Sequence, residues 1–370
     1  MERTKVKNLA KQIRGVSYKP EDLHDSLDED SVILLRANNI DEGKIDFDDV
    51  VYVDKSKVSD EQYLKVGDVL ICASSGSKQL VGKAASVDFD TPCTFGAFCK
   101  VVRPNNNVAD YLGKYFQSGV YRRKISEVAI GANINNIRNE HIDSLELPIY
   151  EPVQAQRIVE KIGLLQNIID NRKCELSKLD DIIKARFVEL FGDYFKSHIN
   201  EKELDEVCDF IDYRGKTPEK SDEGIPLITA KNVKDNKFFI DPQEFIPEEN
   251  YDDVMTRGIP RVNDVLFTTE APLGNVCRIP DVYEKFCVGQ RLITMQPHED
   301  ILKSEYLEYA LASPEFQDKM WQKSSGSTVK GIRSKLLILL TIPVPPMAIQ
   351  EEFKNFLHQV DKSKVVEKYK

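Results

Sequence analysis

The chain repeats itself, and this repeat limits the folds that are open to it. The octapeptide GANINNIR begins at Gly131, and the related GSTVKGIR begins 195 positions later at Gly326. Over the 39 positions from Tyr111 to Ile149 the second copy follows the first without a gap and shares nine identities. Average composition would give roughly two or three. A chain of 370 residues with this period is predicted to fold into two similar domains, because it is too long for one ordinary core.

Upstream of Tyr111 the two copies remain similar but lose the constant offset. VGDVL at Val66 corresponds to VNDVL at Val262, and Asn39-Ile40 corresponds to Asn232-Val233. A drifting offset indicates insertions in loops, which often carry specificity. The two copies are therefore predicted to differ in function within these upstream segments.

Bulk composition is that of a globular protein without a membrane span. Hydrophobic residues make up 41% and charged residues 30% of the chain, and no stretch approaches the roughly 20 apolar residues that a span needs. The charged N-terminus has no apolar core, so no signal peptide is predicted. Seven cysteines without a CxxC pair fit reduced thiols. These features predict a cytoplasmic protein.

The net charge of -10 argues at first against nucleic-acid binding, which depends on Lys and Arg contacts with phosphates. The charges are unevenly distributed, however. Residues 41–49 and 241–253 are acidic in the two copies, whereas residues 114–124 and 319–335 are basic. Each domain is thus predicted to have one basic side that can face phosphate, with a merely solvated surface as the alternative.

Each copy is predicted to be an α+β module, with strands first and helices later. VILLR from Val32, DVLICA from Asp68 and CTFGAFCKVV from Cys93 are expected strands, with counterparts in the second copy. Residues 108–129 and 304–322 are each expected to form a helix. A polar glycine loop, a short helix and a final strand that ends at Pro148 or Pro343 close each copy.

A long helix with heptad spacing is predicted after the first copy. Pro152 and Gln156 correspond to Pro346 and Gln350, and proline in a first turn marks a helix start. The first helix is expected to stop at Gly192. The second is about half as long, so an antiparallel pair would leave part of the seam uncovered, and the chain is expected to be truncated or to be covered there by another subunit. The alternative is a core-facing helix. The predicted seam comprises Ile158, Ile162, Leu165, Ile169, Leu176, Leu179, Ile183, Leu190, Ile349, Phe353, Phe356 and Val360.

Signatures of catalysis and of cofactor binding are weak or missing in this sequence. GSKQLVGKA from Gly76 departs from the phosphate-binding loop by one spacing residue and by Ala84 at the hydroxyl position. The five histidines are scattered without metal-ligand spacing, and no GxGxxG or GxSxG motif occurs. No catalytic residue, metal or cofactor of its own is therefore predicted for the chain.

The remaining polar residues favour recognition of DNA by forked hydrogen bonds. Asn can read adenine, and Arg or Lys can read guanine, in the major groove. The alternative for the loop residues is a turn that caps the next helix. Arg138 and Arg333 are expected to contact phosphate or to form structural ion pairs. The candidate DNA-binding residues are Ser74, Ser75, Lys78, Lys83, Arg122, Arg123, Asn133, Asn135, Asn136, Arg138, Glu270, Lys319, Lys323, Ser327, Thr328, Lys330 and Arg333.

The ordered recurrence of a glycine-polar loop, a strand ending in proline and a Pro-x-x-x-Gln helix start resembles the DNA-specificity subunits of type I restriction-modification systems. The resemblance covers the whole chain. It implies two β-rich target-recognition domains at 1–150 and 193–345, joined by antiparallel coiled-coil spacer helices at 151–192 and 346–370. The second helix is shorter than the family pattern leads one to expect.

The resemblance further implies a division of labour among subunits. Each domain would read one half of a bipartite site in double-stranded DNA, and the helices would set the spacing between the halves. Methyltransferase subunits would supply S-adenosylmethionine and catalysis, and restriction subunits would use ATP and magnesium. Two alternatives remain at this point, namely a coiled-coil interaction scaffold without DNA and the recognition part of a self-contained modification enzyme.

Overall fold

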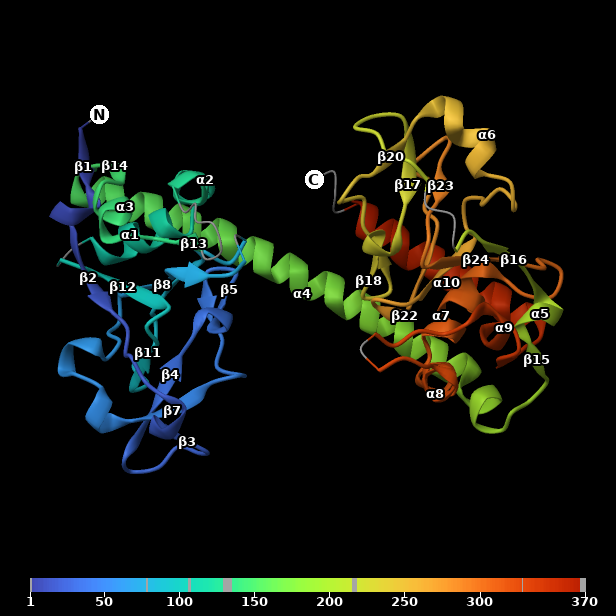
Figure 1. Ribbon diagram of the computed structural model, residues 1–370, viewed down its shortest axis with the longest axis horizontal. Helices are drawn as coiled ribbons and strands as arrows, with labels where there is room; N and C mark the ends of the chain where they lie inside the picture. Colours follow the sequence, from blue (N-terminus) through green and yellow to red (C-terminus); the bar gives the residue numbers. More distant parts are fainter. Residues whose placement is uncertain are drawn as a thin grey trace. The chain divides into compact units, whose positions relative to one another are not determined.

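Two compact units, Met1–Asn171 and Arg172–Lys370, make up the computed structural model of the chain (Figure 1). The structure describes residues 2–77, 79–105, 108–128, 135–214, 218–327 and 329–366. The boundary between the units lies inside one long helix, α4 (Pro152–Lys196). Within the described ranges, every helix is either too short or too polar to span a bilayer.

A four-stranded antiparallel sheet forms the centre of unit 1. Its order is β10-β8-β12-β2, and the strands are β2 (Ala10–Arg14), β8 (Val69–Cys72), β10 (Ala84–Ser86) and β12 (Cys99–Pro104). All four residues of β8 are buried. Because side chains alternate along a strand, these residues fill both faces of the sheet. Val69 and Ile71 join one hydrophobic core, while Leu70 and Cys72 join another.

Helices cover one face of this sheet and a second sheet lies beyond the other face (Figure 1). The helices are α1 (Ala109–Phe116), α2 (Gly119–Val128) and α3 (Asn139–Asp143). The second sheet has the order β11-β4-β7-β3, with β3 (Leu23–His24), β4 (Ser31–Leu35), β7 (Val51–Asp54) and β11 (Cys93–Phe95), and a small hairpin joins β5 (Ile40–Asp41) to β6 (Lys44–Ile45). Strands β4 and β11 run parallel to each other.

Unit 2 repeats the main features of this plan. The order β22-β21-β24-β16 corresponds to β10-β8-β12-β2, and β17 pairs in parallel with β23 as β4 does with β11. The repeat predicted from the sequence is therefore a repeat of topology. The strands are β16 (Cys208–Asp212), β17 (Ile225–Ile228), β18 (Val233–Lys234), β19 (Lys237–Phe238), β20 (Phe245–Ile246), β21 (Val265–Thr269), β22 (Leu273–Arg278), β23 (Cys287–Val288) and β24 (Leu292–Pro297), and the helices are α5 (Leu204–Val207), α6 (Tyr251–Val254), α7 (Ser304–Ala312), α8 (Pro314–Lys323) and α9 (Ser334–Leu337).

Each unit is closed by a short antiparallel strand pair that delivers the chain to a helix. In unit 1, β1 (Arg3–Lys5) pairs with β14 (Glu146–Pro148), and in unit 2, β15 (Glu201–Glu203) pairs with β25 (Thr341–Pro343). Helix α4 follows β14, and α10 (Met347–Val366) follows β25. Both strands end at the proline that the sequence comparison aligned.

Two expected elements are interrupted in the structure. The expected strand CTFGAFCKVV divides into β11 and β12, which belong to different sheets, because the chain turns at Gly96–Phe98. Each expected long helix divides in two, at Ser118 in unit 1 and at Ser313 in unit 2. Both serines accept a hydrogen bond from the backbone N–H three residues later, at 3.3 Å, and thereby cap a new helix. This capping explains why the serine is identical in both copies.

Helix α4 continues past its expected end at Gly192 and stops at Lys196. The cause is packing, since Phe187, Phe191 and Phe195 recur every four residues and are all at least 94% buried in the core of unit 2. This four-residue spacing of phenylalanines is separate from the heptad spacing of the aliphatic residues, and it carries the helix beyond Gly192. A glycine with ordinary helical geometry costs less than these contacts contribute.

Within unit 2, the end of α4 packs against α10, and the two run antiparallel. Arg186 of α4 pairs with Glu352, whereas Asp180, nearer the start of α4, pairs with Lys364 farther along α10 at 2.9 Å. Of the predicted seam, Ile183, Phe353 and Val360 are buried there. Leu179, Leu190, Ile349 and Phe356 pack at the edge of the same core. The seam residues of α4 before Leu179 are exposed or only partly covered, as an unpartnered stretch would be.

Candidate nucleic-acid interface

Three loop segments meet at one end of the central sheet of unit 1, and together they are termed loop cluster 1 (residues 73–75, 96–98 and 135–137). Strand β9 (Ser74–Ser75) pairs antiparallel with β13 (Asn135–Asn136). The Ile137 N–H donates to the carbonyl of Ala73 at 2.8 Å, and the Ala73 N–H donates to the carbonyl of Phe98 at 2.9 Å. The strand loop and the polar loop, predicted separately from the sequence, are thus one surface.

Unit 2 builds the same arrangement, termed loop cluster 2 (residues 269–271, 289–291 and 330–332). The Ile332 N–H donates to the carbonyl of Thr269 at 3.0 Å, and the Thr269 N–H donates to the carbonyl of Arg291 at 2.9 Å. An isolated bridge joins Glu270 to Gly331. Glu270, a candidate predicted only from its position after a strand, therefore lies beside the polar loop, as Ser74 and Ser75 do in unit 1.

Gly326, the glycine of the second octapeptide, shapes the backbone turn that leads into residues 330–332 of loop cluster 2. Gly326 has a φ of +116°, and a Cβ atom there would lie 2.0 Å from the carbonyl oxygen of Val329. Two backbone hydrogen bonds of 2.9 Å between Ser325 and Gly331 close the same turn. Only glycine fits this geometry. The turn fixes the positions of Ser327 and Lys330, which are both exposed.

Several predicted residues, in the clusters or elsewhere in their units, are exposed. Arg138 and Arg333 each occupy the position directly before a short helix, α3 or α9. The Arg138 guanidinium lies 3.5 Å from Glu140 and is 72% exposed, so this ion pair contributes little. The other exposed candidates are Arg123, Asn136, Glu270, Lys323, Ser327, Lys330 and Arg333.

Two other basic candidates are engaged inside their own units. Arg122 donates to the carbonyl of Val81 at 2.5 Å and to that of Gln79 at 2.8 Å, so it holds the turn before β10. Lys83 lies 3.3 Å from a carboxylate oxygen of Asp41. Contacts of these side chains with phosphate would have to compete with these bonds, and such contacts remain predictions.

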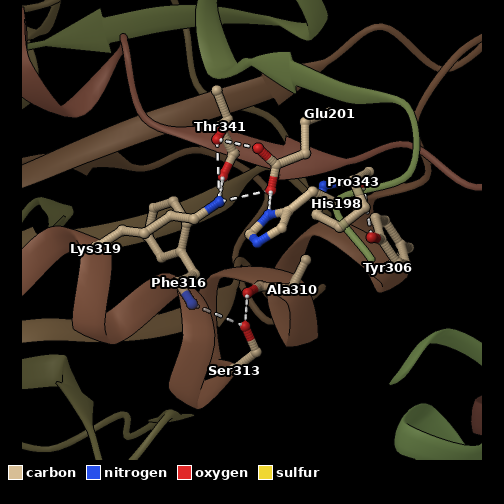
Figure 2. A network of polar contacts seen from close by, with 9 residues as sticks. All are labelled: His198, Glu201, Tyr306, Ala310, Ser313, Phe316, Lys319, Thr341 and Pro343. Atoms are coloured by element: carbon tan, nitrogen blue, oxygen red, sulfur yellow. Dashed lines mark hydrogen bonds and ion pairs between the residues drawn. The ribbon is translucent and has the colours of Figure 1, made fainter. Parts of the chain in front are cut away.

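Lys319 is likewise occupied, in a network shown in Figure 2. Its ammonium lies 2.7 Å from Glu201 and 3.0 Å from the hydroxyl of Thr341, and that hydroxyl donates to Glu201 at 2.9 Å. His198 completes the set at 2.8 Å from the same carboxylate. Burial alone would raise the pKa of Glu201, but the hydrogen bonds from Lys319, His198 and Thr341 outweigh it and lower the pKa to about 2. Lys319 thus ties α8 to the closing strands of unit 2.

Three predicted candidates, Lys78, Asn133 and Thr328, lie outside the described residues. Side-chain placement is also not described for Asn135. Among the side chains that the structure does describe, no three of the His, Cys, Asp or Glu type converge as metal ligands would.

Phe98 and Arg291 belong to the clusters but were missed from the sequence. Phe98 is 69% exposed, and Arg291 has a φ of +67° and lies 3.2 Å from Glu270 through its Nε atom. The signal was present in the glycine that precedes both by two residues, Gly96 and Gly289. The apolar pattern of CTFGAFCKVV predicts one continuous strand and so does not reveal the turn at Gly96.

Comparison with known proteins agrees with this architecture. The model of the type I restriction modification DNA specificity domain matches residues 196–369. The EcoKI specificity subunit of Escherichia coli K12 is 29% identical over 377 residues, which cover 96% of this chain and 81% of that protein. The StySPI specificity subunit of Salmonella potsdam is 38% identical over 180 residues, covering 48% of this chain and 39% of that protein.

A solved structure extends the likeness to the fold. The crystal structure of a type I restriction-modification S subunit from M. genitalium has a TM-score of 0.50 at 15% identity, with 99% of this chain and 91% of that chain covered. The duplicated topology and the paired loop clusters agree with these sequence relatives. Residues 196–369 match the family's DNA specificity domain, and over nearly its whole length the chain is similar to a type I restriction-modification specificity subunit.

Proposed function

We propose that this chain selects the DNA sequence on which a type I restriction-modification complex acts, and that each unit reads one half of a bipartite site. One observation carries the proposal. The same three-segment loop cluster is built twice on the same sheet end, with hydrogen-bonded backbones that match and side chains that differ. Two domains that recognise different half-sites require the same backbone arrangement with different side chains on it.

The chain itself is proposed to be a reader and not an enzyme. Loop cluster 1 offers Asn136 and the β9 serines, and loop cluster 2 offers Glu270 and Lys330, with Ser327 in the turn that leads into it. These groups can donate to or accept from base edges, while the exposed Arg138 and Arg333 suit phosphate. Methyl transfer with S-adenosylmethionine, and cleavage with ATP and magnesium, are proposed to belong to partner subunits.

Helix α4 is proposed to hold the methyltransferase partner and to set the spacing between half-sites. Its apolar residues in the part belonging to unit 1 include Leu165, which is 61% exposed, and Ile169, which is 49% exposed. An apolar stripe along a helix is costly to leave in water, so a partner helix that buries it stabilises the assembly. These residues belong to the predicted seam and are exposed.

Methylome sequencing tests the proposal. Cells that carry this chain together with its methyltransferase should methylate one split sequence that cells lacking the chain leave unmodified. Exchanging residues 1–150 for those of a relative should change one half of that sequence and preserve the other. Unchanged methylation without the chain would contradict the proposal, and methyl transfer by the purified chain alone would contradict the assignment of catalysis to a partner.

A further inference from the structure

The third segment of each loop cluster carries a different side chain at the same backbone position. In unit 1 the carbonyl of Phe98 accepts from the N–H groups of Ala73 and Ser74, at 2.9 and 3.0 Å. In unit 2 the carbonyl of Arg291 accepts from the N–H of Thr269 at 2.9 Å. Phe98 and Arg291 are therefore structural counterparts.

The glycines before these residues support the same correspondence. Gly96 donates its N–H to the carbonyl of Leu35 at 2.9 Å, and Gly289 donates to the carbonyl of Ile228 at 2.7 Å. Both acceptors are the last residues of their strands, β4 and β17. In each unit, backbone hydrogen bonds on both sides of the turn therefore hold the backbone of residue 98 or residue 291 in place.

Phe98 is more exposed than any other large hydrophobic side chain that the structure describes, at 69%. A single exposed apolar residue needs no explanation by itself. Its place does point to a role, because it stands on a rigid turn beside β9 and β13, where polar groups otherwise gather. An apolar side chain at such a position can contact the methyl group of thymine, which only the A·T pair offers in the major groove.

Arg291 places a planar, charged guanidinium group at the corresponding position of unit 2. Glu270 lies 3.2 Å from its Nε atom, and the two side chains remain 56% and 48% exposed. A guanidinium carries five N–H donors in one plane, so a carboxylate at Nε can orient it while its terminal nitrogens bind another acceptor. Guanine offers such an acceptor pair, O6 and N7, in the major groove.

We propose that Phe98 and Arg291 are matched base-reading positions, one in each half-site, with Phe98 contacting a thymine methyl group and Arg291 contacting guanine. Glu270 is then a positioning residue that acts through Arg291. The inference rests on the proposed function. It adds that one position of the fold carries a phenylalanine in unit 1 and an arginine in unit 2, and that this difference makes the two half-sites differ.

The test uses the full chain with its methyltransferase and maps methylated sites by sequencing. Phe98→Ala should relax the preference at one base pair of one half-site, and Arg291→Ala should relax it at one base pair of the other half-site. Each loss of discrimination should be on the order of tenfold to a hundredfold, as for a good base contact. Phe98→Leu, which keeps an apolar side chain, should retain most of the preference.

Arg291→Lys separates base reading from phosphate binding. Lysine keeps the charge but not the planar fork, so the variant should bind DNA while losing the guanine preference. If Arg291→Lys keeps both affinity and preference, Arg291 contacts phosphate and the inference is wrong for unit 2. Val66→Ala and Arg261→Ala are matched controls, because both residues are exposed and precede β8 and β21 at the strand ends away from the clusters.

The outcomes of this experiment also separate the inference from the proposed function. If the unmodified complex methylates no split sequence, the proposed function fails. If it does, and Phe98→Ala and Arg291→Ala leave that sequence unchanged at full thermal stability, the base-reading assignment fails alone. A change confined to the expected half-site by each variant supports both.

Discussion

Tyr111 and Tyr306, identical in the two copies, make the same hydrogen bond in their own units. The Tyr111 hydroxyl donates to the carbonyl of Pro148 at 3.2 Å, and the Tyr306 hydroxyl donates to that of Pro343 at 2.7 Å. Leu145 and Leu340 are likewise both 6% exposed, and their carbonyls accept from the first residue of a short helical turn. At the residue scale, identity between the copies marks the frame that closes each unit.

Gly326→Ala tests the strain in the turn of loop cluster 2. A side chain at a φ of +116° clashes with Val329, so we expect a loss of roughly 1–3 kcal/mol in the stability of this turn and weaker selection of one half-site. Gly163→Ala is the control, because nothing lies within 4 Å of its Cβ position in α4. That variant should be neutral or up to about 1 kcal/mol more stable. Thermal melting and site mapping measure both, and equal behaviour of the two variants would refute the strain.

Glu201→Gln tests the Lys319 network through its pH dependence. The pKa of Glu201 is lowered from 4.5 to about 2 in the folded chain, so the ionised carboxylate stabilises the fold above pH 4.5. This contribution is lost as the pH falls toward 2. We expect the variant to melt at a lower temperature than the parent at pH 7, with the gap closing under acid conditions. A constant gap from pH 7 to pH 3 would contradict this, and Glu203→Gln on the same strand is the matched control.

At the scale of elements, α4 has two kinds of apolar residue on one continuous helix. Toward its C-terminal end, Phe187 and Phe191 pack against Phe353 with ring centroids 5.4 and 5.5 Å apart. Toward its N-terminal end, Leu165 is 61% exposed. The first group stabilises unit 2, and the second is available to a partner. A hydrophobic pattern alone does not distinguish these roles, because both groups follow helical spacing.

Phe353→Ala and Leu165→Ala should separate these two roles. Removing the fully buried Phe353 ring should destabilise unit 2 by about 3–5 kcal/mol. Removing the exposed Leu165 side chain should change the stability of the isolated chain by less than about 0.5 kcal/mol but weaken its assembly with the methyltransferase. Denaturant unfolding and analytical gel filtration with the partner measure the two effects. Normal assembly of the Leu165→Ala chain would show that the stripe is not the docking surface.

At the scale of the whole molecule, acidic charge is compensated within each unit by particular pairs. Asp49 pairs with Arg36 at 2.9 Å in unit 1, and Glu244 pairs with Lys220 and Lys231 at 2.7 Å in unit 2. The net charge nevertheless remains -10, so the overall charge of the chain by itself opposes the approach of DNA, although single basic side chains are exposed. Additional phosphate contacts are expected to come from partner subunits.

A salt titration checks this expectation. The affinity of the chain alone for its target DNA should fall only gently with added salt, because the slope of log K against log salt grows with the number of phosphates contacted. The complex with the methyltransferase should show a steeper slope and a higher affinity. Equal slopes for the chain and the complex would mean that the chain makes all the phosphate contacts itself. Fluorescence anisotropy over a series of salt concentrations measures both slopes.

The order of elements was predictable because local chemistry encodes it. The continuous apolar run of β8, the proline at the start of each long helix and the repeated closing segment are all patterns of residues close together in the chain. Interruptions were harder to predict. The break at Gly96 depends on a hydrogen bond to Leu35, which lies far away in the sequence. The serine caps use local partners, but the sequence does not show that the helix is interrupted there.

The sequence by itself determined the duplication, the α+β order of each unit, the helical spacing of α4 and the resemblance to specificity subunits, because these depend on periodicity and on residues close together in the chain. Only the tertiary structure decided that residues 73–75, 96–98 and 135–137 form one surface, and that Lys319 and Arg122 are occupied within the fold. The physical reason is that such contacts join segments tens of residues apart. Their register depends on how two sheets and three helices pack together, which no local pattern specifies.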